Sequence, residues 1–310
     1  MINLKNSILF LFLLTGFGCT KKEAETKIEE PAPADKGNGI YSFSTGNLTF
    51  EVDAKSGGRI SAFKLDSSDF LSGKKINADN WGSTFWSSPQ SAWGWPPSSE
   101  IDKLEYSGGI IDGSVVLTSK KDPKLGYVVQ KQFMANAADT SVTICYTITN
   151  NSDSTRSASP WEITRVAPQG LTFFPTGKGE KKGKLAPLMK DSLGITWYVY
   201  DSSLVPAGHE KLMCDGAEGW MAQVNNGMIM IKKWDDVSLE QNAPGEGEVE
   251  IYANPDKSYI EIEPQGPYTE LAPGKSLTWE VKWYLRPLPG GMKAEMGNKD
   301  LVDWVRGRVK

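Results

Sequence analysis

Apolar and polar residues alternate along much of this chain, and that alternation constrains the fold more than any other feature. The clearest run is Ser141–Thr149, in which every second residue from Val142 onward is apolar. A period of two is typical of a β-strand with one buried face. Similar runs recur at fairly regular intervals, with turn residues such as Asn150-Asn151 and Pro273-Gly274 between them. Many antiparallel strands and few helices predict an all-β fold of stacked, mostly antiparallel sheets.

The sequence predicts one large domain over residues 39–290. We expect its strands at 48–52, 59–65, 109–118, 126–134, 141–149, 193–200, 220–224, 228–233, 248–253, 258–263 and 276–285. Only the last stretch, about 293–308, has the spacing of a short helix, with Leu301, Val302, Trp304 and Val305 on its apolar side. We therefore assign residues 291–310 to a C-terminal helical appendage.

The N-terminal residues 1–18 have the pattern of a bacterial lipoprotein signal peptide. Lys5 precedes a short apolar run, Ile8–Leu14, and Gly18-Cys19 resembles a lipobox, although Gly16 stands where leucine is usual. Lipidation at Cys19 would tether the chain to a membrane in the bacterial cell envelope, on the periplasmic or surface side. Residues 19–38 are charged and proline-bearing, which predicts a disordered tether. The alternative is a simple secreted protein with Cys19 left over.

Composition argues against several classes of function. The net charge of −4 does not suit a nucleic-acid surface, so we expect no nucleic-acid partner. A single histidine and three cysteines without metal-ligand spacing predict no metal site. No phosphate-binding glycine motif is present, and we expect no cofactor.

The stretch Asn80–Pro97 concentrates aromatic side chains among glycine, proline and serine. Its composition predicts a shaped loop. Large rings beside small polar residues suit a sugar, which has an apolar face and a rim of hydroxyls. We expect substrate-binding residues among its tryptophans, namely Trp86, Trp93 and Trp95. The alternative is that these rings only pack one end of the sheets.

Two carboxylates, Glu261 and Glu263, share one face of the predicted strand 258–263, opposite Ile260 and Ile262. They are followed by Pro264, so the acidic groups lie at a strand end, where sites are often built. The alternative is that both glutamates form a solvated outer face.

The run Glu263-Pro264-Gln265, with Pro273-Gly274 and a final alternating strand, resembles the C-terminal part of the galactose-mutarotase-like (aldose 1-epimerase) superfamily. Gly57-Gly58 and the residues after it resemble that family's first hairpin. The chain from about 40 to 288 is most similar to an uncharacterised branch of the superfamily. This resemblance implies a β-supersandwich with a sugar cleft on its concave sheet, and Glu263 as the catalytic base.

The chain departs from the family where mutarotases carry their catalytic histidine. Trp161-Glu162 stands there instead. Glu162 and Arg165 remain candidates for substrate binding, since a guanidinium offers several donors in a fixed fork. They are equally well explained as a surface ion pair with each other. His209, the only histidine, is the one candidate of its type for the catalytic acid; the alternative is an exposed loop histidine.

Three functions follow from these observations. The first is a membrane-tethered carbohydrate-binding lipoprotein that has kept the mutarotase-like cleft and lost the chemistry. The second is a cofactor-independent sugar epimerase that uses Glu263 and His209. The third is a structural envelope protein without a ligand.

Overall fold

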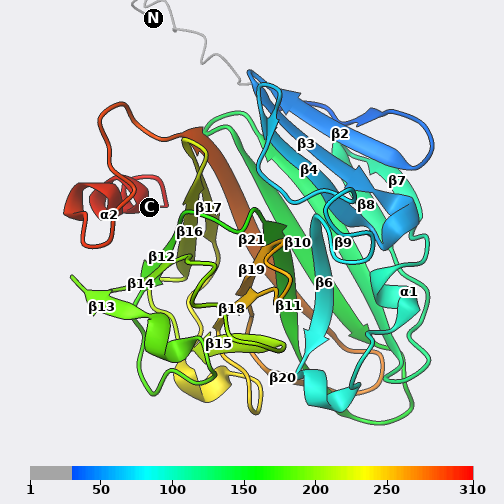
Figure 1. Cartoon of the computed structure of the whole chain (residues 1–310). Helices are drawn as coiled ribbons and strands as arrows, with labels where there is room; N and C mark the ends of the chain where they lie inside the picture. The colour runs from blue at the N-terminus through cyan, green and yellow to red at the C-terminus, as the bar shows by residue number, and fades with distance from the viewer. Residues whose placement is uncertain (1–29, 310) are drawn as a thin grey trace, which may run out of the picture.

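Two large antiparallel sheets make up most of the protein, and the computed structural model describes residues 30–309 (Figure 1). The first sheet has eleven strands in the order β1-β2-β3-β4-β6-β11-β19-β18-β15, with β5 paired to β4 and β20 paired to β11. The second has ten strands in the order β13-β14-β12-β16-β17-β21-β10-β9-β8-β7. The predicted all-β fold of stacked antiparallel sheets is confirmed.

The strands of the first sheet are β1 (Ala34–Asp35), β2 (Ile40–Thr45), β3 (Leu48–Asp53), β4 (Arg59–Leu65), β5 (Ser68–Asp69), β6 (Ser83–Ser88), β11 (Arg156–Val166), β15 (Glu210–Cys214), β18 (Val249–Ala253), β19 (Ile260–Pro264) and β20 (Thr269–Leu271). Those of the second are β7 (Ser107–Ile111), β8 (Ser114–Thr118), β9 (Tyr127–Asn136), β10 (Ser141–Asn150), β12 (Leu171–Pro175), β13 (Lys190–Ser192), β14 (Ile195–Val199), β16 (Trp220–Asn225), β17 (Met228–Lys233) and β21 (Ser276–Pro287). The α-helices are α1 (Ser99–Asp102) and α2 (Lys299–Arg306).

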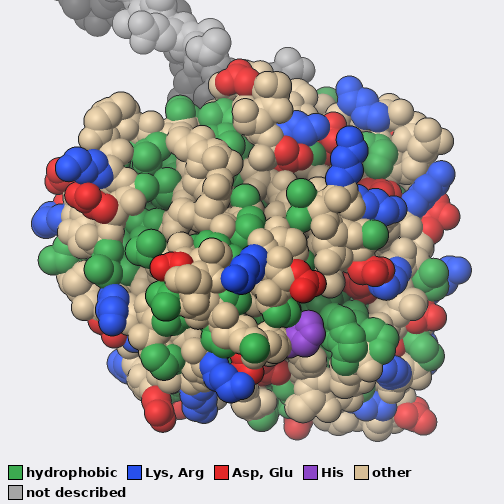
Figure 2. All heavy atoms as spheres, in the orientation of Figure 1, with side chains coloured by type: hydrophobic (Ala, Val, Ile, Leu, Met, Phe, Trp, Pro, Cys, Tyr) green, Lys and Arg blue, Asp and Glu red, His purple; other side chains and the backbone are tan. Residues whose placement is uncertain are grey.

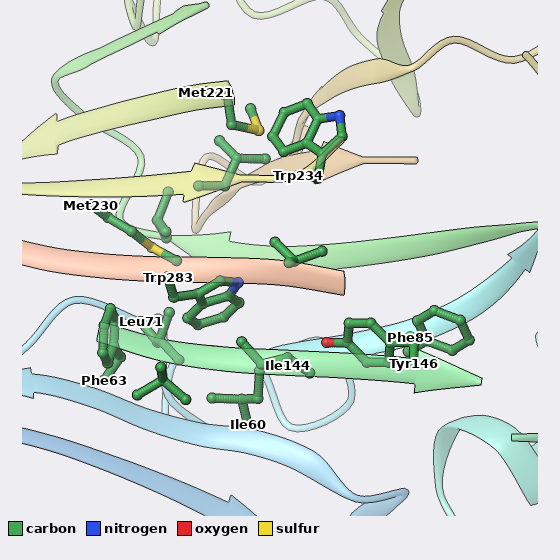
Figure 3. Close-up of a cluster of buried hydrophobic side chains, with 14 of the residues drawn as sticks. Ile60, Phe63, Leu71, Phe85, Ile144, Tyr146, Met221, Met230, Trp234 and Trp283 are labelled. Carbon is green, nitrogen blue, oxygen red and sulfur yellow. The ribbon is translucent and has the colours of Figure 1, made fainter. Parts of the chain in front are cut away.

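The main core lies between the two sheets, where the inward residues of each strand meet (Figure 3). On β10 the apolar residues of the alternating run, among them Ile144 and Tyr146, are buried there. Tyr146 stacks on Phe85 of the first sheet with 4.3 Å between ring centroids. Each large side chain buried in this way contributes about 1.5–3 kcal/mol of transfer free energy, so the alternating pattern is what holds the layers together.

Part of the outer face of the second sheet, on β12, β14, β16 and β17, is also apolar, and α2 covers it. Leu301, Val302 and Val305 of the helix join a cluster with Phe173 and Trp220 of the sheet. The Asn298 side chain caps the helix by accepting from the backbone amides of residues 300 and 301. The predicted C-terminal helix is confirmed, with Trp304 half-buried against the same cluster. Within residues 30–309, no helix is long and apolar enough to cross a membrane.

Several boundaries differ from the sequence-based expectation. The aromatic stretch is not wholly a loop, because Ser83–Ser88 forms β6 in the middle of the first sheet. The glycines and prolines that suggested a loop lie on either side of this strand. Gly82 has a φ of 59°, and a Cβ there would lie 2.3 Å from the carbonyl oxygen of Ile60, so glycine is required. Strand β11 was not predicted as a strand.

The N-terminal predictions are only partly covered by the structure. The signal peptide and Cys19 lie outside the described residues. The tether was predicted to extend to residue 38, whereas Ala34 and Asp35 pair with β2. The first sheet therefore begins several residues before the expected domain boundary at residue 39.

Candidate functional site

A pocket of about 640 Å³ lies on the outer face of the first sheet, away from the main core. Residues from β15, β18 and β19 and from the aromatic stretch contribute to its lining. The lining residues are Asn77, Asn80, Trp86, Gln90, Trp95, Gly183, His209, Glu210, Lys211, Met213, Tyr252, Asn254, Asp256, Tyr259 and Glu261. Figure 2 shows this face, with the single histidine side chain beside a group of hydrophobic side chains.

Strand alternation determines which side chains reach this face. On β19, Ile260 and Ile262 point into the main core, and the glutamates between and after them point the other way. The register places Glu261 opposite Tyr252 and Glu263 opposite Glu250 on β18. The predicted shared face of Glu261 and Glu263 is therefore the pocket side of the sheet, although neither glutamate is exposed to solvent as a surface residue would be.

Trp86 and Trp95 form the aromatic wall of the pocket. Trp86 is fixed within β6, where its Nε1 donates a 2.9 Å hydrogen bond to Asp102. Trp95 packs edge-on against it with 5.9 Å between ring centroids and remains 63% exposed. A rigid buried ring beside a partly free one gives an apolar surface that a ligand can contact.

Trp93 does not line the pocket, contrary to expectation. Its Nε1 donates to the backbone oxygen of Ser87 at 2.7 Å, and its ring packs against Trp86. Trp93 therefore supports the wall from behind. The sequence could not separate it from Trp95, because the two tryptophans lie on either side of Gly94 among similar small residues.

Arg165 and Glu261 form an ion pair at the base of the pocket. The Arg165 Nε lies 2.7 Å from Glu261 Oε1, and the guanidinium carbon lies 5.4 Å from the centre of the Trp86 ring. Glu261 lines the pocket, whereas Arg165 is almost fully buried beneath it. Arg165 thus orients the carboxylate and supports the tryptophan, and its own contact with a ligand is not supported.

Lys211 lies between two buried carboxylates. Its Nζ is 2.9 Å from Glu250 Oε2 and 3.1 Å from Glu263 Oε2, and 4.2 Å from the centre of the Trp161 ring. Trp161 also donates its Nε1 hydrogen to Glu263 at 2.8 Å. The lysine side chain is 21% exposed, whereas both glutamates are fully buried. One cation therefore serves two carboxylates, and we call Lys211, Glu250, Glu263 and Trp161 the outer cluster.

The carboxyl groups of this cluster have unusually high pKa values. Burial raises the pKa of Glu263 to about 8 and that of Glu250 to about 7, against the opposing effect of Lys211. Burial would lower the pKa of Lys211, but the surrounding glutamates outweigh it and raise that pKa. These raised pKa values leave the two carboxyl groups partly protonated near neutral pH. Glu263 Oε1 has no hydrogen-bond partner.

Glu263, the expected catalytic base, does not line the pocket. It lies beneath Lys211 and Trp161, with no exposed surface. Trp161 occupies the position at which the family's histidine was expected, and its ring nitrogen is used to hold Glu263. The expectation that Glu263 lies on the pocket face was correct, but its direct access to a ligand is not supported.

Glu162 lies on the opposite side of the first sheet, in the main core. It accepts hydrogen bonds from Tyr146 at 2.6 Å and from Trp283 at 3.0 Å, and it pairs with Lys232 at 2.7 Å. Its expected role in substrate binding is therefore wrong, and so is a surface ion pair with Arg165. Residues 162 and 165 of one strand differ by an odd number, which places their side chains on opposite faces.

His209 lies in the pocket, as expected for a role in the cleft. Its Nδ1 is 2.7 Å from the hydroxyl oxygen of Tyr252, and the two rings are nearly parallel with centroids 6.0 Å apart. Both residues line the pocket together with Glu261. A histidine, a tyrosine and a carboxylate thus share one cavity, and this group can bind hydroxyls or exchange protons with a ligand.

From the sequence, no role was assigned to Tyr252, Glu250 or Lys211. The alternation in Val249–Ala253 is a usable signal, because it places Glu250 and Tyr252 on one face and the apolar residues on the other. Within residues 30–309, no group of three or more histidine, cysteine, aspartate or glutamate side chains is arranged to hold a metal ion.

Comparison with known proteins agrees with this architecture. Residues 41–286 match the family model described as a domain of unknown function, DUF4380. No curated protein matches the sequence. A galactose mutarotase-like protein from Lactobacillus casei superposes with a TM-score of 0.57 at 13% identity, covering 80% of this chain and 100% of its own. A galactose mutarotase related enzyme from Lactobacillus acidophilus gives 0.55 at 9% identity, covering 82% and 99%.

A third solved structure, a TPR-domain containing protein from Parabacteroides distasonis, gives a TM-score of 0.59 at 13% identity, covering 84% of this chain and 49% of its own. At such low identities these matches show the fold alone. The galactose mutarotase-like architecture expected from the sequence is confirmed.

Proposed function

Because the chain belongs to the DUF4380 family and has a galactose mutarotase-like fold, we propose that its outer pocket binds a carbohydrate. The observation that carries this proposal is the pocket itself. Its volume of about 640 Å³ falls within the range of ~300–1,000 Å³ usual for small-molecule sites. It is walled by tryptophan and tyrosine rings, and amide, histidine and carboxylate groups lie between them.

The lining suits the two kinds of surface on a sugar ring. Trp95, with most of its surface exposed, offers a flat apolar face for the C–H groups. The side chains of Asn77, Asn80 and Gln90 offer both donors and acceptors for hydroxyls. Apolar stacking and amide hydrogen bonding in one cavity favour a polyhydroxylated ring over a purely apolar ligand.

Binding without catalysis is favoured by the outer cluster. A general base must lie within hydrogen-bonding reach of the proton that it removes. Glu263 is buried beneath Lys211 and Trp161, so the residue expected to act as base has no route to a sugar in the pocket.

A sugar epimerase is the second candidate, and the pair of His209 and Tyr252 favours it. These two residues and Glu261 line the same pocket and supply proton donors and acceptors without Glu263. Following the interconversion of anomers by NMR, on freshly dissolved sugars, distinguishes the two candidates. We expect no acceleration by the wild-type protein; acceleration that is lost in His209→Ala would establish the enzyme.

Carbohydrate binding is tested by tryptophan fluorescence with a panel of mono- and oligosaccharides. Trp95→Ala should weaken binding by ~1–2 kcal/mol, as for other exposed aromatic contacts, with little change in melting temperature. Trp304→Ala on α2 is the matched control, because it removes a tryptophan packed against the second sheet. A panel without any response would leave the ligand-free structural protein as the better explanation.

We also propose that the protein is tethered to a membrane by a lipid at Cys19, in the bacterial cell envelope. The short apolar segment Ile8–Leu14 and the Gly18-Cys19 junction support this proposal. In a bacterial host, Cys19→Ala should lose acyl labelling and leave the membrane fraction or remain uncleaved. Unchanged acyl labelling of that variant would contradict the anchor.

A further inference from the structure

Building on the proposed carbohydrate site, we propose that the pocket selects sugars that carry a protonated amine and rejects sugars that carry a carboxylate. Two observations support this selectivity. One is the balance of charges in and directly beneath the pocket, and the other is which of those charges a ligand can reach.

Carboxylates outnumber cations around the pocket. Five carboxylate side chains line it or lie directly beneath it, and three cations are paired with them. The carboxylates are Glu210, Glu250, Asp256, Glu261 and Glu263, and the cations are Arg165, Lys184 and Lys211. Even with one of the two buried glutamates, Glu250 or Glu263, protonated, four carboxylates remain against three cations. In a partly closed pocket, where water screens poorly, that excess attracts a cation and repels an anion.

Each cation at the pocket is already paired with at least one carboxylate. The Nζ atom of Lys211 is already bound to two glutamates. Arg165 is paired with Glu261 through Nε, and its unpartnered Nη1 atom is buried. Nor do the lysines of the neighbouring loop change this result: Lys184 pairs with Glu210 and Lys181 with Asp191, and only the glycine between them lines the pocket.

Carboxylates, in contrast, are available to a ligand amine. Glu261 lines the pocket and uses Oε1 for Arg165, and its second oxygen is not among the buried atoms without a partner. Asp256 at the rim is exposed and takes part in none of the ion pairs of residues 30–309. An ammonium group beside either carboxylate would make charge-assisted hydrogen bonds, which are about twice as strong as neutral ones.

The test compares matched sugars that differ in one substituent, using the full-length protein in detergent at pH 7 and calorimetry. The probes are glucose, glucosamine and glucuronate, with the galactose series alongside. We expect the amino sugar to bind about 5- to 10-fold tighter than the neutral sugar, and the uronate to bind weakest. The difference should shrink in ~0.5 M salt, because salt screens exposed charges.

Two variants locate the effect. Asp256→Asn should reduce the amino-sugar preference by about 2- to 3-fold without a change in melting temperature, since this residue is exposed and unpaired. Glu261→Gln should remove most of the preference. Because this change also breaks a buried ion pair, the melting temperature of the variant is measured as well, to show that it is still folded. Glu280→Gln, on the second sheet, removes an exposed carboxylate elsewhere and should change nothing.

The outcomes separate the two proposals. If neutral sugars bind as well as amino sugars, or if uronates bind best, the charge selectivity is wrong and carbohydrate binding stands. A preference for amino sugars that survives in both Asp256→Asn and Glu261→Gln would also overturn the inference. If no sugar of any charge binds, the carbohydrate site itself is wrong, and the inference falls with it.

Discussion

The first sheet carries a buried lysine, glutamate and tryptophan cluster on each of its faces. On the inner face, Glu162 binds Lys232, which lies 4.9 Å from the centre of the Trp283 ring. On the outer face, Glu263 binds Lys211, which lies 4.2 Å from the centre of the Trp161 ring. In both clusters the tryptophan donates its ring N–H to the glutamate. We call Glu162, Lys232, Trp283 and Tyr146 the inner cluster.

The two clusters differ in whether their hydrogen bonds and charges are balanced. In the inner cluster one lysine meets one carboxylate, and both oxygens of Glu162 are occupied. In the outer cluster one lysine meets two carboxylates, Glu263 Oε1 has no partner, and Lys211 is in contact with the pocket. A satisfied buried cluster serves to specify the fold, whereas a half-satisfied one beside a cavity marks a candidate site.

The largest effect is expected from breaking the inner cluster. Lys232→Met should lower the free energy of unfolding by ~3–5 kcal/mol, because it leaves Glu162 buried without its cation. Denaturant titration followed by circular dichroism measures this loss. The double variant Lys232→Met/Glu162→Gln should recover part of it, since no uncompensated charge remains. A loss below about 1 kcal/mol in Lys232→Met would show that the pair is not buried as a charged unit.

A smaller effect is expected from the corresponding change in the outer cluster. Lys211→Met should cost ~2 kcal/mol at pH 8 and less at pH 5, because Glu250 and Glu263 can then take up protons. The same denaturant titration at the two pH values provides the measurement. An equal loss for Lys211→Met and Lys232→Met at both pH values would remove the distinction between the clusters.

The smallest expected effect is the pH dependence that Glu263 of the outer cluster contributes. A glutamate whose folded-state pKa is raised stabilises the fold fully below its unfolded pKa of about 4.5. This contribution is lost as the pH rises through about 7 to 8. The free energy of unfolding should therefore fall by ~1–2 kcal/mol more between pH 5 and pH 8 in the wild type than in Glu263→Gln.

The control for this pH measurement is Glu270→Gln, which changes an exposed glutamate on β20 and should keep the wild-type slope. If Glu263→Gln also kept the wild-type slope, Glu263 would not be the group that holds the raised pKa.

The sequence predicted the fold better than the site. Alternation in stretches such as Ser141–Thr149 depends only on local burial, so strands and their inward faces could be predicted. The alternation in 258–263 also placed Glu261 and Glu263 on one face correctly. Of the three tryptophans proposed from the aromatic stretch, Trp86 and Trp95 line the pocket.

What could not be predicted depends on contacts between distant strands. Glu162 was misplaced because β11 was not predicted as a strand, so the parity that separates it from Arg165 was not applied. The burial of Glu263 depends on Lys211, which is 52 residues away in sequence and two strands away in the sheet order. No local pattern encodes that pairing. Trp93 and Trp95 differ only through the turn between them.

The order of strands in the first sheet also determines where the pocket is held relative to the attachment of the chain. The described chain enters this sheet at β1, one edge, whereas the pocket is built near the other edge, which ends at β15. The path from one edge to the other has nine strands, and its eight steps of ~4.8 Å give roughly 40 Å along the sheet. If the β1 edge of the sheet is held in place, the pocket therefore lies near the opposite edge. Its distance from the point of attachment is set by the width of the sheet.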